Sequence, residues 1–290
     1  MPTIITSPLE TYQHNLPIIA NVIDTFTNPG ILGIHLEGPF ISKEPGAVGC
    51  HPAKYTLLPS IDLLKEWQLL ARGHIVLITI AAELKGSQEL CTWATNNNIA
   101  VSLGHQLATA QDVKQLVECG ATLCTHLGNG MPNMIHRHQN PIWTSLAEDR
   151  LTCMIITDGE HLPIDAVVAM IRAKGTSGIV VTSDAAPVAG LPDGSYKWGS
   201  TPVRCLSGKV CHATLPCLAG SGSLMMECMN VLAGIKTSKQ GWLLELDDLI
   251  RVSCDNPLNV LPGIGEDIKE WVQGNPSVWF DEEKRVFVAL

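Results

Sequence analysis

The chain has 290 residues, of which 46% are hydrophobic, enough for one large domain or for one domain with a small appendage. Its net charge of -9 and pI near 5.5, with no basic run to offset them, argue against nucleic acid as the main partner. Because the first residues do not form a signal peptide and no apolar run reaches the roughly 20 residues that span a bilayer, we expect a soluble, cytoplasmic protein without a membrane partner.

Short apolar runs alternate with amphipathic segments over the first 184 residues. The apolar runs are continuous, as expected of parallel strands that are buried on both faces. They cover residues 2–6, 31–36, 75–80, 99–103, 121–125, 151–157 and 178–183. Helical patterns cover residues 60–73, 87–98, 109–120 and 163–175. This alternation predicts βαβ units and a parallel sheet.

The pattern changes after residue 185. Residues 193–213 are typical of short strands and turns, 221–235 and 244–261 are typical of helices, and 276–290 of a hairpin. We therefore expect a barrel domain over residues 1–262 and a hairpin over 263–290 that is a remnant of a small β-domain.

Four of the predicted strands end at a polar residue: Glu37, His105, His126 and Asp184. A carboxylate and two imidazoles form a ligand set for a divalent metal, and a nearby Asp can carry the proton of a metal-activated water. Catalytic-type residues at the ends of several different strands favour a (β/α)8 TIM-like barrel over a doubly wound sheet. Seven strands beginning at residue 2 suggest that the first barrel strand is absent.

Each of these residues also has a plain structural interpretation. Glu37 could cap a loop, a single strand-end His is often a hydrogen-bonded core residue, and Asp184 could belong to a turn. The loop at 126–138 is either a flexible surface loop or a source of backbone amides for an anion, with Arg137 as a further contact. Small residues at 218–226 either form a wall for a ligand or begin a helix, with Ser221 or Ser223 as the N-cap.

None of the ten cysteines forms a CxxC pair. We interpret them as reduced thiols of a cytosolic protein. The even spacing of Cys205, Cys211 and Cys217 leaves a structural metal site as a weaker alternative.

The segments HLEGP, GAVGCHP, LGH, THLGNGM, DGEH, TSDA and LAGSGSL occur in the order typical of one family. From about residue 2 to about residue 262, the chain resembles the N-acetylglucosamine-6-phosphate deacetylase family of the amidohydrolase superfamily. The resemblance implies a (β/α)8 barrel with a small β-sandwich made from both chain ends. It also implies removal of the acetyl group from N-acetylglucosamine 6-phosphate, which gives acetate and glucosamine 6-phosphate.

The resemblance also implies roles for individual residues. Glu37, His105 and His126 would hold one divalent ion, with Zn favoured and Fe, Mn or Co also suited to these ligands. Asp184 would act as the catalytic base and acid. The positions that match substrate contacts are Cys50, His51, Asn129, Gly130, Arg137, His161, Leu218, Ala219 and Gly220. The family's Arg at the position of Arg137 reaches the phosphate bound to a neighbouring subunit, so a homodimer is implied.

The chain departs from the family in three places. The family's N-terminal β-segment and first barrel strand have no counterpart here, Gly128 and Gly130 replace an aromatic residue and Ala, and the tail after residue 263 differs. Three explanations would account for the missing segment: another segment takes its place, the start codon is misassigned, or the gene is a decayed copy. Two alternative functions follow: an amidohydrolase acting on another N-acyl or cyclic amide, and a truncated, inactive homologue.

Overall fold

A single parallel sheet forms the centre of the molecule, as expected. The computed structural model describes residues 1–26, 30–238, 241–275 and 277–290. Seven strands lie side by side in sequence order. They are β1 (Thr3–Ile5), β2 (Ile34–Glu37), β3 (Ile75–Ile80), β4 (Ala100–Leu103), β5 (Leu123–Cys124), β6 (Thr152–Ile155) and β7 (Ile179–Val181). The parallel pairing predicted from the continuous apolar runs is confirmed.

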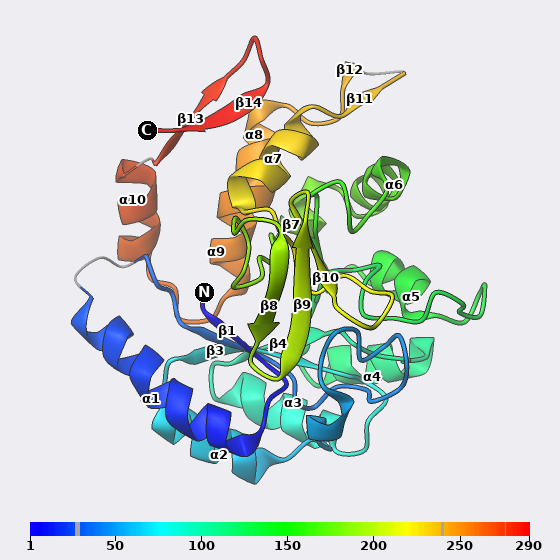
Figure 1. Cartoon of the computed structure of the whole chain (residues 1–290), viewed down its shortest axis with the longest axis vertical. Helices are drawn as coiled ribbons and strands as arrows, with labels where there is room; N and C mark the ends of the chain where they lie inside the picture. The colour runs from blue at the N-terminus through cyan, green and yellow to red at the C-terminus, as the bar shows by residue number, and fades with distance from the viewer. Residues whose placement is uncertain (27–29, 239–240, 276) are drawn as a thin grey trace.

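A helix connects each strand to the next and covers the outside of the curled sheet, as in a TIM-like barrel (Figure 1). These helices are α1 (Leu9–Thr25), α2 (Ile61–Leu70), α3 (Ser87–Asn96), α4 (Ala110–Glu118), α5 (Pro141–Ala147) and α6 (Ile164–Lys174), with short 3-10 turns at Ala53–Tyr55 and Thr176–Gly178. Ser60 caps α2, since its hydroxyl accepts a hydrogen bond from the backbone N–H of Leu63. Among the described residues, none of the helices is both long and apolar enough to cross a membrane.

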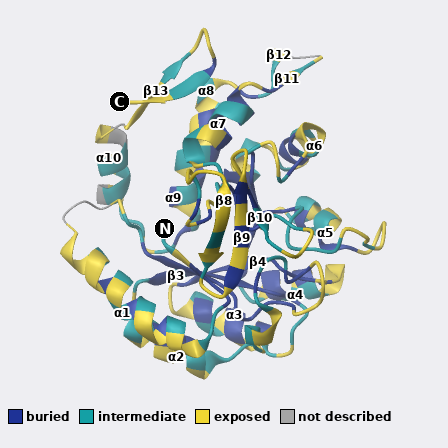
Figure 2. Ribbon diagram, in the orientation of Figure 1, coloured by how far each residue is buried: buried dark blue, intermediate teal, exposed yellow. Residues whose placement is uncertain are grey.

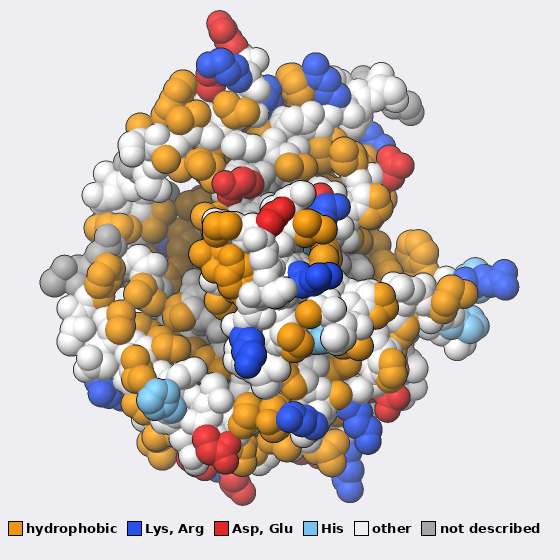
Figure 3. All heavy atoms as spheres, in the orientation of Figure 1, with side chains coloured by type: hydrophobic (Ala, Val, Ile, Leu, Met, Phe, Trp, Pro, Cys, Tyr) orange, Lys and Arg blue, Asp and Glu red, His pale blue; other side chains and the backbone are white. Residues whose placement is uncertain are grey.

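The sheet is open within the described residues. There, β1 pairs with β2 alone and β7 with β6 alone, so no pairing joins the two end strands. The space-filling view shows a hollow lined mostly by apolar side chains between α1, the C-terminal helix α10 (Glu266–Gly274) and a small sheet formed by β8 (Gly194–Trp198), β9 (Thr201–Leu206) and β10 (Lys209–His212) (Figure 3).

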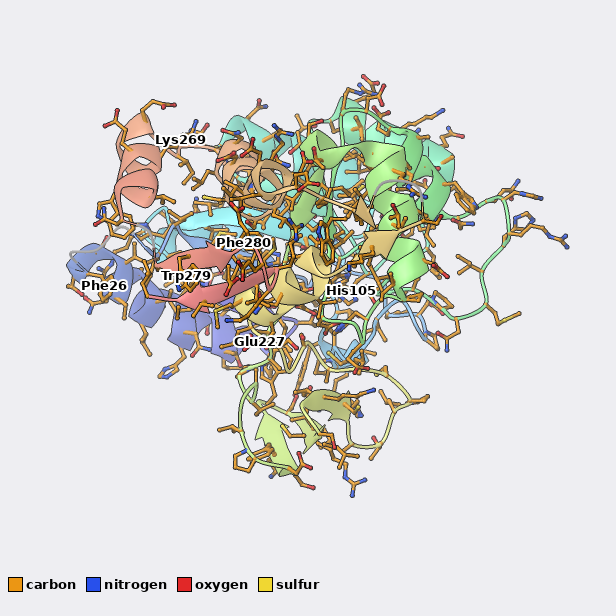
Figure 4. All side chains as sticks on the ribbon, turned by 90° about the horizontal axis from the view of Figure 1, so that it is seen from above. Phe26, His105, Glu227, Lys269, Trp279 and Phe280 are labelled. Carbon is orange, nitrogen blue, oxygen red and sulfur yellow. The ribbon has the colours of Figure 1, made fainter. Side chains whose placement is uncertain are left out.

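The second half of the chain adds a small antiparallel sheet and a helical layer. The sheet contains β8 (Gly194–Trp198), β9 (Thr201–Leu206) and β10 (Lys209–His212), and it projects from the barrel (Figure 4). The remaining elements are α7 (Met225–Ala233), β11 (Lys236–Thr237), β12 (Gly241–Trp242), α8 (Leu246–Ile250), a π-helical turn (Arg251–Asp255), α9 (Asn256–Val260), α10 (Glu266–Gly274), β13 (Val278–Asp281) and β14 (Val286–Ala289). The C-terminal hairpin is formed by β13 and β14 alone, because Glu266–Gly274, which was expected to belong to it, forms helix α10.

One expectation about helices was wrong, and one helix was not predicted. Helix α7 begins at Met225 with Leu224 at the N-cap, so neither Ser221 nor Ser223 caps it. Helix α1 is not among the helical segments expected from the sequence; it contains Pro17 and has no side-chain cap. Tertiary packing stabilises α1 instead of local helix signals, because Tyr12 is completely buried against the neighbouring helix α2.

The packing between α1, α2 and the sheet depends on three stacked aromatic rings. Trp67 is 1% exposed and lies between Tyr12, with ring centroids 4.3 Å apart, and Phe40, with centroids 5.7 Å apart. Figure 2 shows the buried residues concentrated on the central sheet and on the inward faces of these helices.

We expect Trp67→Ala to lower the free energy of unfolding by about 3–5 kcal/mol, because it removes the stack and leaves a cavity. Leu69→Ala is the matched control on the same helix, since Leu69 is 80% exposed and its loss should cost about 0.5 kcal/mol or less. Urea denaturation followed by circular dichroism measures both. Equal effects of the two substitutions would show that the stack does not stabilise the fold.

Candidate metal centre and active site

The residues expected to form the site all lie at or just past strand ends. Glu37 is the last residue of β2, while His105, His126 and Asp184 follow β4, β5 and β7. These last three have positive φ angles of 51°, 28° and 49°. Non-glycine residues rarely adopt this conformation, which costs about 1–3 kcal/mol and occurs often at functional sites. The backbone therefore turns sharply at each of the three side chains.

The strands bring one carboxylate and two imidazoles together. Oε1 of Glu37 lies 3.0 Å from Nε2 of His105 and 3.0 Å from Nε2 of His126, and the two Nε2 atoms are 3.0 Å apart. The three side chains are 5–6% exposed. Among the described residues, this is the one group of three or more His, Cys, Asp or Glu with ligand atoms close enough to hold a metal ion.

The tautomer of His105 fits a metal ligand. Its Nδ1 lies 2.8 Å from the carbonyl oxygen of Ala47, which can only accept a hydrogen bond. Nδ1 therefore carries the hydrogen, and the neutral ring presents a bare Nε2 to Glu37. This is the usual outer contact of a metal-binding histidine. Nδ1 of His126 is buried and has no such acceptor among the described residues.

The electrostatics of the three residues also favour a bound cation. Burial alone would raise the pKa of Glu37, but its contacts with His105 and His126 hold that pKa well below the usual range. Burial works against the charged form of His126, yet Glu37 raises the pKa of that ring. A buried carboxylate facing two imidazole nitrogens thus requires positive charge between them, which a divalent ion supplies.

His51 stands beside this centre. Its Nδ1 accepts a hydrogen bond from the backbone N–H of Thr6 over 3.4 Å and lies 2.9 Å from the hydroxyl of Thr6, which can also donate to it, so the hydrogen of the neutral ring is assigned to Nε2. That Nε2 lies 4.0 Å from Oε1 of Glu37. Burial, with a smaller contribution from His105, lowers the pKa of His51 to about 3, which keeps the ring neutral.

A cavity of about 750 Å³ opens above the centre, a size typical of small-molecule sites. Asp184 lines it as a half-buried side chain, and its pKa is raised to about 6 by desolvation and by the charge of Glu37. Most of the other expected site residues also line this cavity. They are Glu37, Cys50, His51, His105, His126, Asn129, Gly130, His161, Leu218 and Gly220.

Gly130 adopts its conformation for a clear physical reason. It has a φ of 60°, and a Cβ there would lie 3.0 Å from Nδ1 of His105 and 3.1 Å from Cε1 of His126. The residue that replaces the family's Ala therefore packs directly against both imidazoles. Beside it, the buried Nδ2 of Asn129 has no hydrogen-bond partner among the described residues.

Two expected contacts lie away from the cavity. Arg137 is exposed on the loop between β5 and α5 and does not line the cavity of its own chain. Ala219 is fully buried in the cluster under β9 and β10 instead. Their assigned roles remain predictions.

The sequence pattern did not indicate that the β8–β10 region covers the site. Trp198 from β8, and Leu215, Pro216 and Cys217 after β10, line the cavity. Their turn-rich, alternating pattern indicates strands but carries no signal of where the small sheet docks.

No family model matches the chain, but similar proteins are known. The N-acetylgalactosamine-6-phosphate deacetylase of Shewanella sp. (strain ANA-3) is 31% identical over 294 residues, which cover 100% of this chain and 70% of the relative. The N-acetylglucosamine-6-phosphate deacetylase of Bacillus subtilis (strain 168) is 35% identical over 192 residues, which cover 66% of this chain and 48% of the relative. The chain thus spans between about half and 70% of the length of these relatives.

Solved structures agree with these relatives. The N-acetylglucosamine-6-phosphate deacetylase of Thermotoga maritima matches 99% of this chain and 76% of its own, with a TM-score of 0.81 and 26% identity. The enzyme of the same name from Pasteurella multocida, at a TM-score of 0.83 and 24% identity, shows the same fold.

We expect Glu37→Gln to weaken Zn²⁺ binding more than about 100-fold, beyond the roughly 10- to 100-fold caused by changes to residues behind the ligands. The reason is the loss of the single negative charge between the two imidazoles. Equilibrium dialysis followed by elemental analysis measures the bound metal. Glu44→Gln is the control, because Glu44 is exposed in the following loop. Unchanged metal content in Glu37→Gln would disprove the assignment.

Proposed function

Because the chain belongs to the N-acetylglucosamine-6-phosphate deacetylase family, we propose that it removes the acetyl group from N-acetylglucosamine 6-phosphate. The products would be acetate and glucosamine 6-phosphate. The observation that carries this proposal is the convergence of Glu37, His105 and His126 below a cavity that Asp184 also lines. This arrangement suits hydrolysis of an amide better than chemistry that needs a covalent intermediate.

In this proposal Glu37, His105 and His126 hold one divalent ion, with Zn²⁺ favoured and Fe, Mn or Co also compatible with the ligand set. When bound, such an ion supplies Lewis acidity towards the amide carbonyl and makes water easier to deprotonate.

Two side chains of the chain itself would move or donate hydrogens. Asp184, with its pKa raised to about 6, takes a proton from the attacking water and returns it to the nitrogen of the departing amine. His51 is neutral with its hydrogen on Nε2, so it can donate to the carbonyl oxygen as negative charge develops there. Asp184 faces the cavity from the end of β7, and His51 faces it from the loop after β2.

The remaining cavity residues would position the sugar phosphate. Asn129 offers an unpartnered amide N–H, and Gly130 allows close approach to its backbone. Cys50, His161, Leu218 and Gly220 complete the proposed wall, and Ala219 packs behind it in the buried cluster. Since Arg137 lies outside the cavity of its own chain, we assign it to the phosphate bound by a second copy in a homodimer.

The wider organisation follows from the same proposal. The barrel would cover residues 1–262. Residues 263–290, with the hairpin β13–β14, would be part of a small β-domain, and a first barrel strand would lie between β1 and β7. The ten free cysteines suit a reducing compartment, so a cytoplasmic location is part of the proposal.

A second candidate substrate is the epimer N-acetylgalactosamine 6-phosphate. The relative that aligns with 100% of this chain is named for that substrate. A different N-acyl or cyclic amide is the next alternative, and a truncated, inactive homologue is the alternative without catalysis.

We expect Asp184→Asn to lower kcat by about 100- to 10,000-fold, the range for loss of a general base. Metal content should stay unchanged because Asp184 is outside the cluster of three ligands. Acetate release and elemental analysis measure the two quantities, and Asp149→Asn, at an exposed site, is the control. Near-normal turnover with metal bound would rule out the assigned role.

Side-by-side assays on both epimers, with and without the 6-phosphate, separate the candidate functions. We expect the phosphorylated N-acetylglucosamine to be hydrolysed with the highest kcat/KM, and Arg137→Ala to raise KM for phosphorylated substrates alone. Arg172→Ala is the matched control, because Arg172 is exposed on α6. A preference for the galactosamine epimer would select the second candidate, and no turnover by the metal-loaded protein would support the inactive homologue.

A further inference from the structure

Asp158 lies in the loop after β6 and is buried, with its side chain 2% exposed. Its Oδ1 accepts hydrogen bonds from the backbone N–H groups of Glu160 and His161, both over 2.9 Å. Its Oδ2 lies 2.7 Å from Nδ1 of His161 and accepts from the hydroxyl of Ser221 over 2.7 Å. These four contacts satisfy the carboxylate and hold its pKa below the usual range, although burial works in the opposite direction.

This carboxylate determines which nitrogen of His161 carries the hydrogen. Oδ2 of an ionised Asp158 can only accept, so Nδ1 of His161 is the donor. The other nitrogen, Nε2, is left for the cavity that His161 lines. The side chain of His161 is 6% exposed, so the ring has little freedom to turn.

Ser221 connects Asp158 to a second part of the site. Its hydroxyl binds Asp158, its backbone N–H donates to the carbonyl oxygen of Asp184 over 2.7 Å, and its own carbonyl oxygen accepts from Ala186 over 2.9 Å. Ser221 therefore pairs with the chain on both sides of Ala185, directly after Asp184, whose φ is positive. Asp158 thus has two routes to the cavity, through the ring of His161 and through the backbone at Asp184.

We propose that Asp158 is a positioning residue that fixes the tautomer and orientation of His161, so that Nε2 of His161 meets the substrate. The inference rests on the proposed deacetylase function and deepens it, because it assigns a role to a residue outside the expected set. Carboxylates behind functional histidines act in this way in other sites. The alternative is that Asp158 merely caps its own loop, or acts through Ser221 on Asp184.

The first experiment measures the tautomer of His161 in the unsubstituted protein. Nitrogen-15 NMR of the metal-loaded protein reports the tautomer of each imidazole, and His161→Asn identifies the signals of His161 by their absence. We expect hydrogen on Nδ1 and a bare or substrate-bound Nε2. Hydrogen on Nε2 with a bare Nδ1 would overturn the proposal directly.

The second experiment measures the kinetic consequence. We expect Asp158→Asn to lower kcat/KM by about 10- to 100-fold, mainly through KM, because the proposed reaction moves no proton through His161. In a His161→Asn background, the same substitution should cost less than about threefold, since residues that act through one another are not additive. Glu160→Gln is the control, as it breaks only the exposed ion pair between Glu160 and Lys209.

The outcomes separate this inference from the proposed function. A fall in kcat that persists in the His161→Asn background would assign Asp158 to the Ser221 route and contradict the proposal. An equal fall in Glu160→Gln would show a general disturbance of the loop. Inactivity of the unsubstituted, metal-loaded protein would instead contradict the deacetylase function, while the tautomer of His161 would still test the positioning role.

Discussion

The buried carboxylate of Glu37, 3.0 Å from two imidazole nitrogens, is the constraint to which the rest of the structure conforms. Groups of this kind cannot be buried together without compensating positive charge. Strands β2, β4 and β5 hold their ends at the spacing that the proposed divalent ion would need. Hydrogen-bonded hydroxyl groups connect these strands below the three residues. The hydroxyl of Thr125, directly before His126, lies 2.8 Å from the hydroxyl of Thr79 and 2.6 Å from that of Ser102.

Sharp backbone turns orient the side chains that follow the strand ends. The positive φ angles of His105, His126 and Asp184 place each residue just after the chain leaves the sheet. Glycines beside these turns allow the neighbouring side chains to lie close to the backbone. A Cβ on Gly104 would lie 2.7 Å from the Cβ of Thr125, and a Cβ on Gly130 would be in close contact with both imidazoles. The cost of these conformations is offset by the surrounding packing, which defines the geometry before any ligand arrives.

The sequence predicts the centre of this structure better than its margins, for physical reasons. Continuous apolar runs can be buried only in a two-sided sheet, so strand ends, and with them Glu37 and His105, can be located from the pattern. Helix α1 is hard to predict from the sequence because Pro17 and the absence of a side-chain cap disfavour a helix locally. It is stabilised instead by the stacking of the buried Tyr12 on Trp67. Asp158 is hard to predict for a related reason: its partner Ser221 lies 63 residues away, and no local pattern indicates that the two meet.

The proposed site residues differ in how close they lie to β1 and β7, the two end strands of the sheet within the described residues. The proposed metal ligands lie at the ends of β2, β4 and β5, each paired on both sides. Asp184, the proposed proton carrier, follows β7, and His51, the proposed donor, contacts Thr6 directly after β1. An end strand lacks one row of backbone hydrogen bonds, so its terminus is held more weakly than that of an inner strand. The pairing of Ser221 on both sides of Ala185 restrains the chain directly after Asp184. In the proposed function, metal binding would therefore depend on the interior of the sheet, whereas proton transfer and carbonyl activation would depend on the contacts that restrain its two end strands.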